Sequence, residues 1–444
     1  MTVAASLFIL ILLLVIGVPV PFCFMAAVLF MMLATGSFSP VFLLSTGFNQ
    51  INSLAVLCIL FFILMGGIMS STGIAARLVA ISDTLLGRTK SGLGTVSVVS
   101  SAIFGSIAGT STAAVAAIGS IMIPRMVQQG YPRGQATALI SSASVIGQLI
   151  PPSVPMILYA WVTWQSVAAC FLSTVVPGLL MVLLYSLVNW VMIRKLPIKT
   201  MPPASLNNRV KAFGTSVYKG FWALLLPVIV LGGIYGGVFT PTEAAGVASI
   251  YCLFIGYAIY RNLTIPMYVN SLINSVTTTG VIVLMVFFVM MLSKLYVMQN
   301  VPQNLVNSLL GLTENIYLIM ILVNLFLLLL GMLMDDFSGT ILAAALLFPA
   351  MTEIGIHPIH FAAILGTNLG LGNITPPTAP ILYLSARIGN CPLDQMIKPQ
   401  LIFICTCSLP VMLITTFFPP LSLTLPQLLM PEVVPHVPLF IGGN

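Results

Sequence analysis

Charged side chains are scarce in this sequence. Its 444 residues include only 15 Lys or Arg and 8 Asp or Glu, so 5% of them carry a charge, whereas 59% are hydrophobic. About a quarter of the residues in a soluble domain are charged. A chain this poor in charge cannot cover a globule in water, which excludes a soluble enzyme, a nucleic-acid-binding protein and a disordered scaffold. The composition predicts a polytopic membrane protein.

The motifs of covalent catalysis are absent as well. The sequence contains no Walker motif, no GxSxG nucleophile elbow and no HExxH zinc motif, and its three histidines make no metal-binding pattern. Its seven cysteines include no CxxC pair. We therefore predict no catalytic residue and no organic cofactor, and we do not expect an enzyme.

Positive charge is concentrated in the first half of the chain. Residues 1–219 hold 11 basic residues and one acidic residue, whereas residues 220–444 hold 4 basic and 7 acidic residues. The most basic stretch runs from Arg194 to Lys219 and contains no acid. Because cytoplasmic loops of membrane proteins are enriched in Lys and Arg, the sequence predicts a cytoplasmic loop at 194–220.

Apolar stretches that could form membrane helices recur along the whole chain. A spanning helix needs about 20 mostly apolar residues. The long stretches lie at 6–33 (broken near Pro19), 54–69, 170–193, 221–238, 244–260, 277–297, 316–334 and 400–418. Shorter pieces, interrupted by Gly, Ser, Thr and Pro, lie at 92–123, 136–162, 338–350 and 360–385. Together they predict an all-α protein with roughly ten to twelve membrane segments.

The interrupted segment at 92–123 predicts a re-entrant helical hairpin. Small residues occupy its middle, from Gly105 to Thr112, and Lys90 and Arg125 flank it, which places both of its ends on the cytoplasmic side. Non-helical backbone at membrane depth is tolerated only where protein buries it or where it lines a wet cavity. The alternative, one kinked spanning helix, would place the two basic ends on opposite sides of the membrane.

The two halves of the sequence repeat one spacing. Four features of the first half recur in the second half at one constant offset in residue number: Pro124, Gly130, Gly147 and the run Pro151–Pro155 correspond to Pro349, Gly355, Gly372 and the run Pro376–Pro380. The second half also has a small-residue break at 335–340, with Glu314 and Glu353 at the bases of its two arms. Paired discontinuous helices in halves of opposite charge are typical of inverted-repeat secondary transporters.

This repeat predicts a division of the chain into scaffold and transport segments. We expect N-terminal scaffold helices at 1–90, a first transport repeat at 91–193 (hairpin 92–127, broken helix 136–162), the basic loop at 194–220, scaffold helices at 221–312, a second transport repeat at 313–425 (hairpin 314–353, broken helix 360–385) and a C-terminal tail at 426–444.

The breaks carry the groups that a cation site needs. Helix C-terminal ends and unwound carbonyls bind Na⁺, and helix N-termini favour anionic substrate groups. Hydroxyl and amide side chains near the breaks add neutral ligands: Ser106, Thr110, Ser111, Thr112, Ser338, Thr340, Thr375, Asn368 and Asn373. Helix capping and interhelical packing are the alternative roles of such side chains.

Three acidic residues admit both a functional and a structural interpretation. Asp335 and Asp336 are flanked by apolar sequence, where a carboxylate is costly and usually has a task. They could bind a cation or support the second hairpin tip, and they could also cap the following helix. Glu243 belongs to the run Thr240-Pro-Thr-Glu243, which predicts a capping box with Pro at the first helical position.

Several motifs in order along the chain resemble the large membrane subunit of the TRAP family, the tripartite ATP-independent periplasmic transporters (DctM-like). They are Gly66–Arg77, Ser101–Ser111, Ile121–Pro124, Leu149–Ile157, Phe239–Ala245, Gly331–Asp335 and Asn368–Pro377. The resemblance covers nearly the whole chain. It implies an elevator-type transporter of a bacterial inner membrane, in which a mobile domain carries both hairpins and a scaffold stays in place.

The resemblance also implies partners, a coupling ion and sites. A periplasmic substrate-binding protein would deliver an organic acid, such as a C4-dicarboxylate or sialic acid, and a sodium gradient would drive its uptake. We expect the small four-helix membrane subunit to be a separate chain. One sodium site would lie at Gly105, Ser106, Gly109, Gly147 and Ile150, and a second at Gly331, Asp335, Gly370, Gly372 and Thr375. The substrate would lie near Ser111, Thr112, Asn368 and Asn373.

Two departures from the family pattern affect the expected substrate pocket. The family often has Ser-Gly-Ser where this chain has Ala108-Gly109-Thr110, and a Val-Gly or Ile-Gly pair where it has Thr378-Ala379. Two other functions stay open at this point. One is a self-sufficient Na⁺/dicarboxylate or Na⁺/H⁺ transporter without a binding protein, and the other is a membrane enzyme or scaffold that transports nothing.

Overall fold

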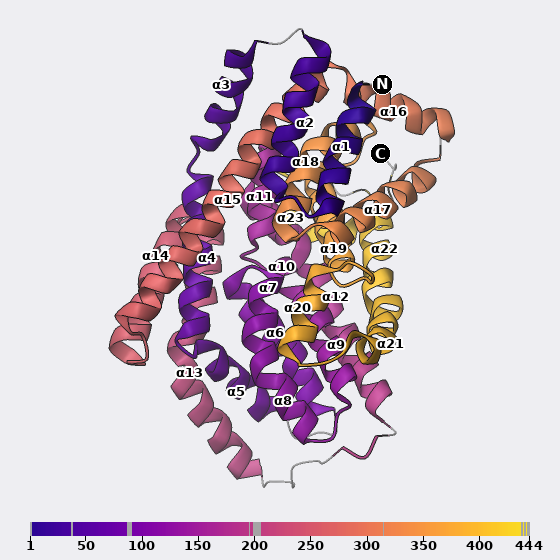
Figure 1. Ribbon diagram of the computed structural model, residues 1–444. Coiled ribbons are helices and arrows are strands. Elements are labelled where there is room, and N and C mark those ends of the chain that lie inside the picture. Colours follow the sequence, from indigo (N-terminus) through magenta and orange to yellow (C-terminus); the bar gives the residue numbers. More distant parts are fainter. Residues whose placement is uncertain are drawn as a thin grey trace.

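Every regular element in the described part of the chain is a helix. The computed structural model describes residues 2–36, 39–86, 91–194, 196–198, 206–313 and 315–436, together with 438 and 441. These residues form 23 α-helices and three π-helical turns, without a strand. Figure 1 shows the helices assembled into one elongated bundle. The expectation of an all-α protein is confirmed.

Six helical segments within the described residues are long and apolar enough to cross a membrane. They are Val167–Ile193, Phe213–Tyr235, Pro241–Ile259, Ile265–Met298, Ile316–Leu333 and Leu393–Phe417. Two bent helix pairs raise the number to eight: Pro40–Ile51 with Ala55–Ser71, bent by 50°, and Arg133–Leu149 with Val154–Thr163, bent by 42°. The larger predicted number also included shorter apolar pieces such as α6 (Gly92–Ala108).

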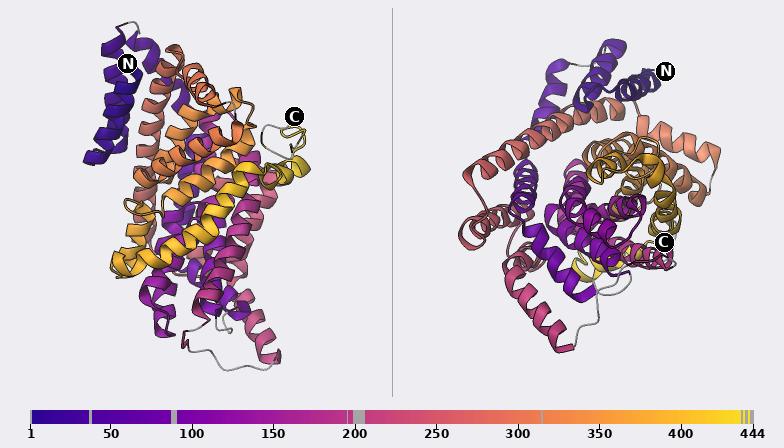
Figure 2. Two further views of the ribbon diagram at one scale, coloured as in Figure 1. Left: turned by 90° about the vertical axis from the view of Figure 1, so that its right-hand side faces the viewer. Right: turned by 60° about the horizontal axis from the view of Figure 1, so that its bottom comes forward.

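One set of helices borders the remaining ones: in Figure 1 most of it lies on the left and at the top, with its last helix at the upper right, and Figure 2 shows it beside the rest of the bundle. It comprises α1 (Thr2–Ile16), α2 (Val20–Thr35), α3 (Pro40–Ile51), α4 (Ala55–Ser71), α5 (Ile74–Leu86), α13 (Leu206–Tyr235), α14 (Pro241–Phe254), α15 (Ile265–Met298) and α16 (Val301–Leu312). The break predicted near Pro19 in the stretch 6–33 is present, but its two parts do not form one span. The chain turns at Gly17, which has a φ of 91°, and α2 packs back against α1.

The remaining helices contain the two halves of the repeat. The first half comprises α6, α7 (Ser111–Ala114), η1 (Val115–Gly119), α8 (Ser120–Gln128), α9 (Arg133–Ser144), α10 (Ile146–Leu149), α11 (Val154–Thr163) and α12 (Val167–Ile193). The second half comprises α17 (Ile316–Leu333), α18 (Asp336–Glu353), α19 (Pro358–Gly372), α20 (Pro380–Ile388), α21 (Leu393–Phe403), α22 (Leu409–Phe417) and α23 (Pro420–Leu429).

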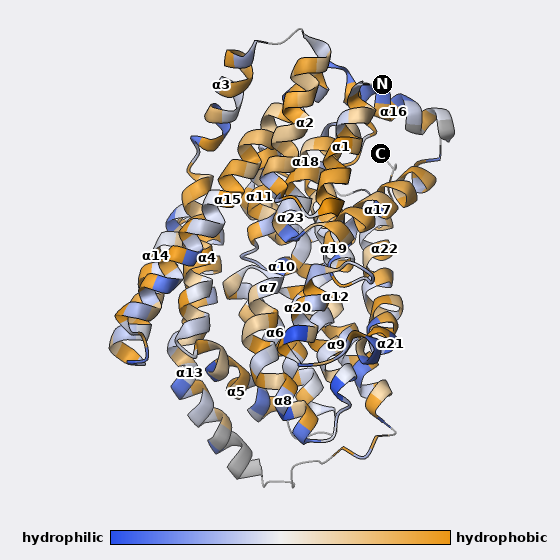
Figure 3. Cartoon of the chain, in the orientation of Figure 1, coloured by the Kyte–Doolittle hydropathy of each residue, from blue (hydrophilic) through white to orange (hydrophobic). Residues whose placement is uncertain are grey.

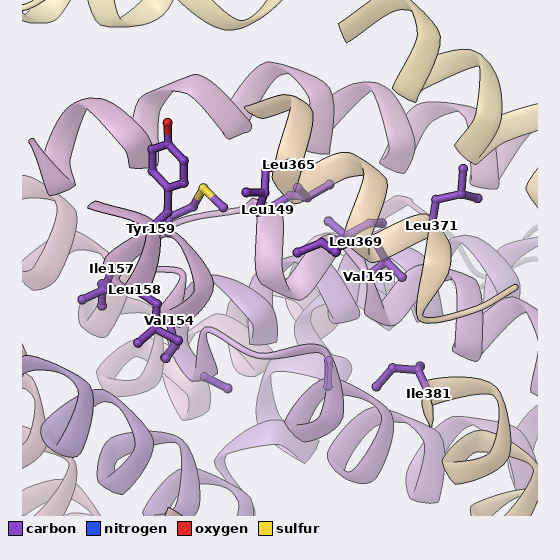
Figure 4. Packing of buried hydrophobic residues seen from close by; sticks show 14 of the residues in the cluster. Val145, Leu149, Val154, Ile157, Leu158, Tyr159, Leu365, Leu369, Leu371 and Ile381 are labelled. Carbon is purple, nitrogen blue, oxygen red and sulfur yellow. The ribbon is translucent and has the colours of Figure 1, made fainter. Parts of the chain in front are cut away.

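The two halves share one hydrophobic core. Figure 4 shows Val145 and Leu149, from the first half, beside Leu365 and Leu369 of α19, and all four side chains are buried. Tyr159 of α11 reaches across the same boundary, because its hydroxyl donates a hydrogen bond of 2.7 Å to the Pro358 carbonyl. Such a shared core makes the two halves one packed unit.

The helix ends follow local sequence signals. At the start of α14 the Thr240 hydroxyl accepts a hydrogen bond from the Glu243 N–H (3.3 Å), and the Glu243 carboxylate accepts one from the Thr240 N–H (2.8 Å). With Pro241 in the first turn, this arrangement confirms the predicted capping box.

The surface divides into an apolar body and a more polar end. Figure 3 shows hydrophobic residues over α15 and α17, and hydrophilic ones around α8, α9 and α21. Arg125, at the polar end, pairs with Asp83 of α5 at 2.6 Å. The positive-inside rule predicts that this end faces the cytoplasm. Lys90, Lys195, Lys199 and Glu314, which also entered the charge argument, lie outside the described residues.

Candidate functional site

The first hairpin (residues 92–128) turns at Gly109. This residue ends α6 in the left-handed conformation, with a φ of 68°, and its carbonyl accepts a hydrogen bond from the Val154 N–H (3.0 Å). Thr110 then caps α7, since its hydroxyl accepts from the Ala113 N–H (3.3 Å). The left-handed turn permits a sharp reversal that a residue with a side chain would oppose.

The second hairpin (residues 316–353) turns at the matching position. Asp335 is the counterpart of Thr110 in the second half of the repeat and is likewise the N-cap of the helix that follows. Its carboxylate accepts hydrogen bonds from the N–H groups of Ser338 (3.3 Å) and Phe337 (3.4 Å). The capping role that the sequence allowed for Asp335 is confirmed.

Paired glycines bring each hairpin against the broken helix of its own half. A Cβ atom on Gly105 would overlap the Cα of Gly147. In the second half a Cβ atom on Gly372 would lie 2.6 Å from the Cα of Gly331. Both approaches need glycine, because Cβ atoms do not come this close to backbone atoms. The backbones of the hairpins and the broken helices therefore touch directly.

Asp336 joins all four broken segments at one buried centre. Its side chain, only 4% exposed, accepts hydrogen bonds from the hydroxyl and the N–H of Ser111 and from the Asn373 amide. Gln148, with its amide oxygen accepting from the Gly370 N–H (3.0 Å), donates to Asp336 Oδ1 (2.8 Å). One carboxylate thus holds α7, α10 and the end of α19 against the start of α18.

The side chains that meet at Asp336 occupy equivalent positions in the two halves of the repeat. Ser111 and Asp336 are 225 residues apart. Gln148 and Asn373 have the same separation, which also relates the proline and glycine features of the two halves. Equivalent positions of the two halves therefore meet at the Asp336 carboxylate. A buried carboxylate that accepts several hydrogen bonds is held far more firmly than one without them.

The residues expected to bind sodium gather at the two breaks. In the first half, Gly105, Gly109 and Gly147 lie together at the turn, and Ile150 ends α10. The Ser106 hydroxyl, in contrast, donates to a carbonyl of its own helix, that of Ile103 (2.7 Å). No group of three or more His, Cys, Asp or Glu side chains among the described residues could hold a metal ion, so a cation here would depend on backbone and hydroxyl oxygens.

The residues expected to form the second sodium site do not lie together in one place. Gly331 contacts Gly372, and Gly370 lies against Gln148. The Thr375 hydroxyl donates to the Leu371 carbonyl at 2.6 Å. Asp335 caps α18 and faces a different cavity of about 340 Å³, which α2 and α15 also line. Asp336, which the sequence left as an alternative to Asp335, is the acid that lies at the centre.

The four residues expected to contact substrate lie in different surroundings. Ser111 and Asn373 are buried and bonded to Asp336. Asn368 is buried too, and its amide donates to Asn324 of α17 (3.0 Å) and to the Ile364 carbonyl (2.8 Å). Thr112 alone of the four lines the large cavity beside the first hairpin.

That cavity, of about 680 Å³, separates the first hairpin from α4 and α15. The hairpin side contributes Thr110, Thr112 and the small residues around them, and Phe337 contributes from the second hairpin. None of the described residues that line it carries a charge. Its volume suits a small organic molecule. A ligand there would be held by hydroxyl, amide and backbone groups.

The opposite wall contains polar residues that the sequence reasoning missed. Asn270 and Asn274, one helical turn apart on α15, are exposed to the cavity, and neither side chain hydrogen-bonds to another described residue. Ser70 and Ser71 face them from the end of α4. Amides without a protein partner in a largely apolar helix are solvated by water or by a ligand. Their spacing of four was the signal that could have revealed them.

Comparison with known proteins identifies the family. The family model for the tripartite ATP-independent periplasmic transporter, DctM component, matches residues 7–421. This chain belongs to the TRAP transporter DctM family. It is therefore a multi-pass membrane component of a tripartite transporter and not an enzyme.

Similar proteins cover nearly all of this TRAP permease. It is 32% identical over 414 residues to the sialic acid TRAP transporter large permease protein SiaM of Vibrio cholerae, covering 93% of this chain and 96% of SiaM. It is 33% identical over 380 residues to the C4-dicarboxylate TRAP transporter large permease protein DctM of Pseudomonas aeruginosa, covering 86% and 88%. With the isethionate TRAP transporter permease protein DctMQ of Oleidesulfovibrio alaskensis it shares 32% identity over 97% of this chain, but it spans only 65% of DctMQ.

A solved structure supports the fold. The YdaH transporter of Alcanivorax borkumensis matches with a TM-score of 0.59 and 15% identity, over 84% of this chain and 87% of YdaH. At this identity the match concerns the fold alone. It supports the all-helical membrane architecture with bent helices.

Proposed function

We propose that this chain is the large permease subunit of a sodium-coupled importer for a small carboxylate, such as a C4-dicarboxylate, sialic acid or a related organic acid. A periplasmic binding protein delivers the substrate, and a separate small four-helix membrane subunit completes the scaffold in the bacterial inner membrane. The observation that carries the proposal is the cavity between the first hairpin and α4 and α15, in a member of the TRAP family.

We further propose an elevator mechanism with an inverted repeat. Residues 91–193 and 313–425 form the transport domain, with re-entrant hairpins near 92–127 and 314–353 and broken helices near 136–162 and 360–385. Residues 1–90 and 221–312 form the scaffold, 194–220 the cytoplasmic loop and 426–444 a tail. The shared core of the two repeats supports their movement as one body, and the cavity against α4 and α15 supports a sliding boundary.

The chemistry of the breaks supports sodium as the coupling ion. Pro151, Pro152, Pro376 and Pro377 have no N–H to offer, so carbonyl oxygens outnumber donors where the broken helices are interrupted. Such oxygens suit a hard monovalent cation. The substrate carboxylate binds beside them through Thr112 and the amides of α15.

Reconstitution in proteoliposomes tests the proposal. The chain, its small membrane subunit and its binding protein are incorporated together or singly, and uptake of labelled carboxylates is measured. We expect uptake only when all three components are present. Uptake by the chain alone would instead establish a self-sufficient transporter, and binding without uptake by the complete set would refute transport.

A further inference from the structure

A second large cavity lies at the polar end of the molecule, away from the first hairpin. It measures about 730 Å³ and lies between α5, the first turns of the apolar part of α13, and the end of η2 (Ile255–Ile259). Figure 1 shows α5 and the start of α13 at the lower end. This is the end that carries the basic residues, so the cavity opens at the cytoplasmic face of the membrane.

Two cations face this cavity without an acid. Arg77 of α5 and Lys219 of α13 line it, and no Asp or Glu is among its described lining residues. Neither cation makes a salt bridge with another described residue. The Arg77 guanidinium lies over the Tyr260 ring, 3.8 Å from its centroid, which fixes its orientation but leaves its charge unbalanced.

Aromatic side chains complete the lining. Trp222 and Tyr218 are exposed beside the cations, and the Tyr260 hydroxyl donates to the Lys219 carbonyl (3.2 Å), which ties the end of η2 to α13. Trp and Tyr gather at the level of the lipid headgroups, where an apolar ring and a polar edge are both accommodated. Lys219 is the last charged residue of α13, and the rest of the helix to Tyr235 has none, which places the membrane boundary near Lys219 and these aromatic residues.

We propose that this cavity binds the phosphate headgroup of an anionic glycerophospholipid from the cytoplasmic leaflet. Arg77 and Lys219 bind the phosphate, and Trp222 and Tyr218 pack against the glycerol and the start of the acyl chains. Unbalanced cations, a cavity large enough for a headgroup and aromatic residues at the interface together match this ligand. The site is independent of the substrate cavity and of the proposed transport function.

Native mass spectrometry of the full chain in a nonionic detergent tests this proposal. Short-chain phosphatidylglycerol and phosphatidylcholine of equal chain length are titrated separately, and inorganic phosphate is added as a competitor. We expect phosphatidylglycerol to bind more tightly than phosphatidylcholine, and millimolar phosphate to leave it bound. Equal binding of the two lipids would overturn the proposal, and displacement by inorganic phosphate would assign the site to free phosphate instead.

Variants locate the site. Lys219→Gln should weaken phosphatidylglycerol binding about fivefold, and Lys219→Gln with Arg77→Gln roughly 25-fold, from the usual effect of one basic residue at an anionic membrane surface. Lys219 is exposed, so its substitution leaves folding intact. Arg194→Gln is the matched control, because Arg194 also lies over an aromatic ring, that of Trp190 at 5.3 Å, but outside the cavity. Unchanged binding in the double variant, or an equal loss in the control, would overturn the assignment.

Discussion

Replacing Asp336 by Asn tests whether this carboxylate joins the two repeats. The variant has the same shape but turns one acceptor oxygen into a donor NH2 group. One side of Asp336 faces the hydroxyl and N–H of Ser111, and the other faces the amides of Gln148 and Asn373. If the NH2 group faces Gln148 and Asn373, both of their amide donors lose an acceptor. If it faces Ser111, the Ser111 hydroxyl can accept from it, but the Ser111 N–H and the second NH2 hydrogen are left without an acceptor. At about 1–3 kcal/mol for each buried donor left unpaired, less the relief of burying a charge, we expect a net loss of about 2–4 kcal/mol.

Asp335→Asn is the matched control for this experiment. It makes the same chemical change one residue earlier and removes the same repulsion between the neighbouring acids. Asp335 makes its hydrogen bonds within its own helix start, and Asn caps a helix about as well as Asp. We therefore expect its stability to change by less than about 0.5 kcal/mol.

Thermal unfolding of both purified variants in the same detergent provides the measurement. The account predicts that Asp336→Asn lowers the Tm by roughly 2–4 °C, since a chain of this length has a large entropy of unfolding. Asp335→Asn should leave the Tm within about 1 °C of the wild type. Equal Tm values for the two variants, or a larger loss for Asp335→Asn, would refute the assignment of Asp336 as the shared centre.

Two further predictions concern backbone packing and the cavity wall. Gly105→Ala places a methyl group onto the Gly147 Cα, and we expect it to cost about 3 kcal/mol or more. Gly280→Ala, where a Cβ meets nothing within 4 Å, should stabilise α15 by up to about 1 kcal/mol. Similar Tm changes for the two variants would contradict the close contact between Gly105 and Gly147. Asn274→Leu should lower uptake at least about tenfold, since removing one buried polar contact to substrate is worth more than about 1.4 kcal/mol, without lowering the Tm. Full uptake by the Asn274→Leu variant would show that this part of α15 does not contact the substrate.

The sequence predicted the repeat but not the contact that it creates. The constant offset between the halves came from prolines and glycines, whose effects on the backbone can be read from sequence. That Ser111 and Asp336 would meet required knowing how the two halves pack, which spacing alone does not determine. Gln148 was missed for this reason, although it is the counterpart of Asn373 in the repeat and lies next to Gly147.

The cavity wall was missed because of a misplaced helix boundary. The sequence predicted a span at 277–297, whereas α15 already begins at Ile265. Asn270, Ser271 and Asn274 lower the hydropathy of this first part, so the predicted span began only after them. Polar residues that line a cavity weaken the very signal by which a membrane helix is recognised. Tertiary packing shields these polar residues from lipid, so this segment can still be helical.

The acidic residues at helix starts could be interpreted in part from the sequence. Thr240 and Glu243 form the predicted capping box, since both partners are close in sequence and their geometry is local. The adjacent acids Asp335 and Asp336 could not be told apart from sequence, because both lie at the start of one helix. Only the direction of each side chain, toward its own helix or toward the other repeat, separates their roles.

The most direct test of the account is the dependence of uptake on sodium. Proteoliposomes that contain the chain, its small membrane subunit and its binding protein are given a labelled carboxylate under an inward sodium gradient, an inward proton gradient or neither. The account predicts accumulation only with the sodium gradient, and its collapse when an ionophore equalises sodium across the membrane. Accumulation driven by the proton gradient alone, or unaffected by the loss of the sodium gradient, would contradict it.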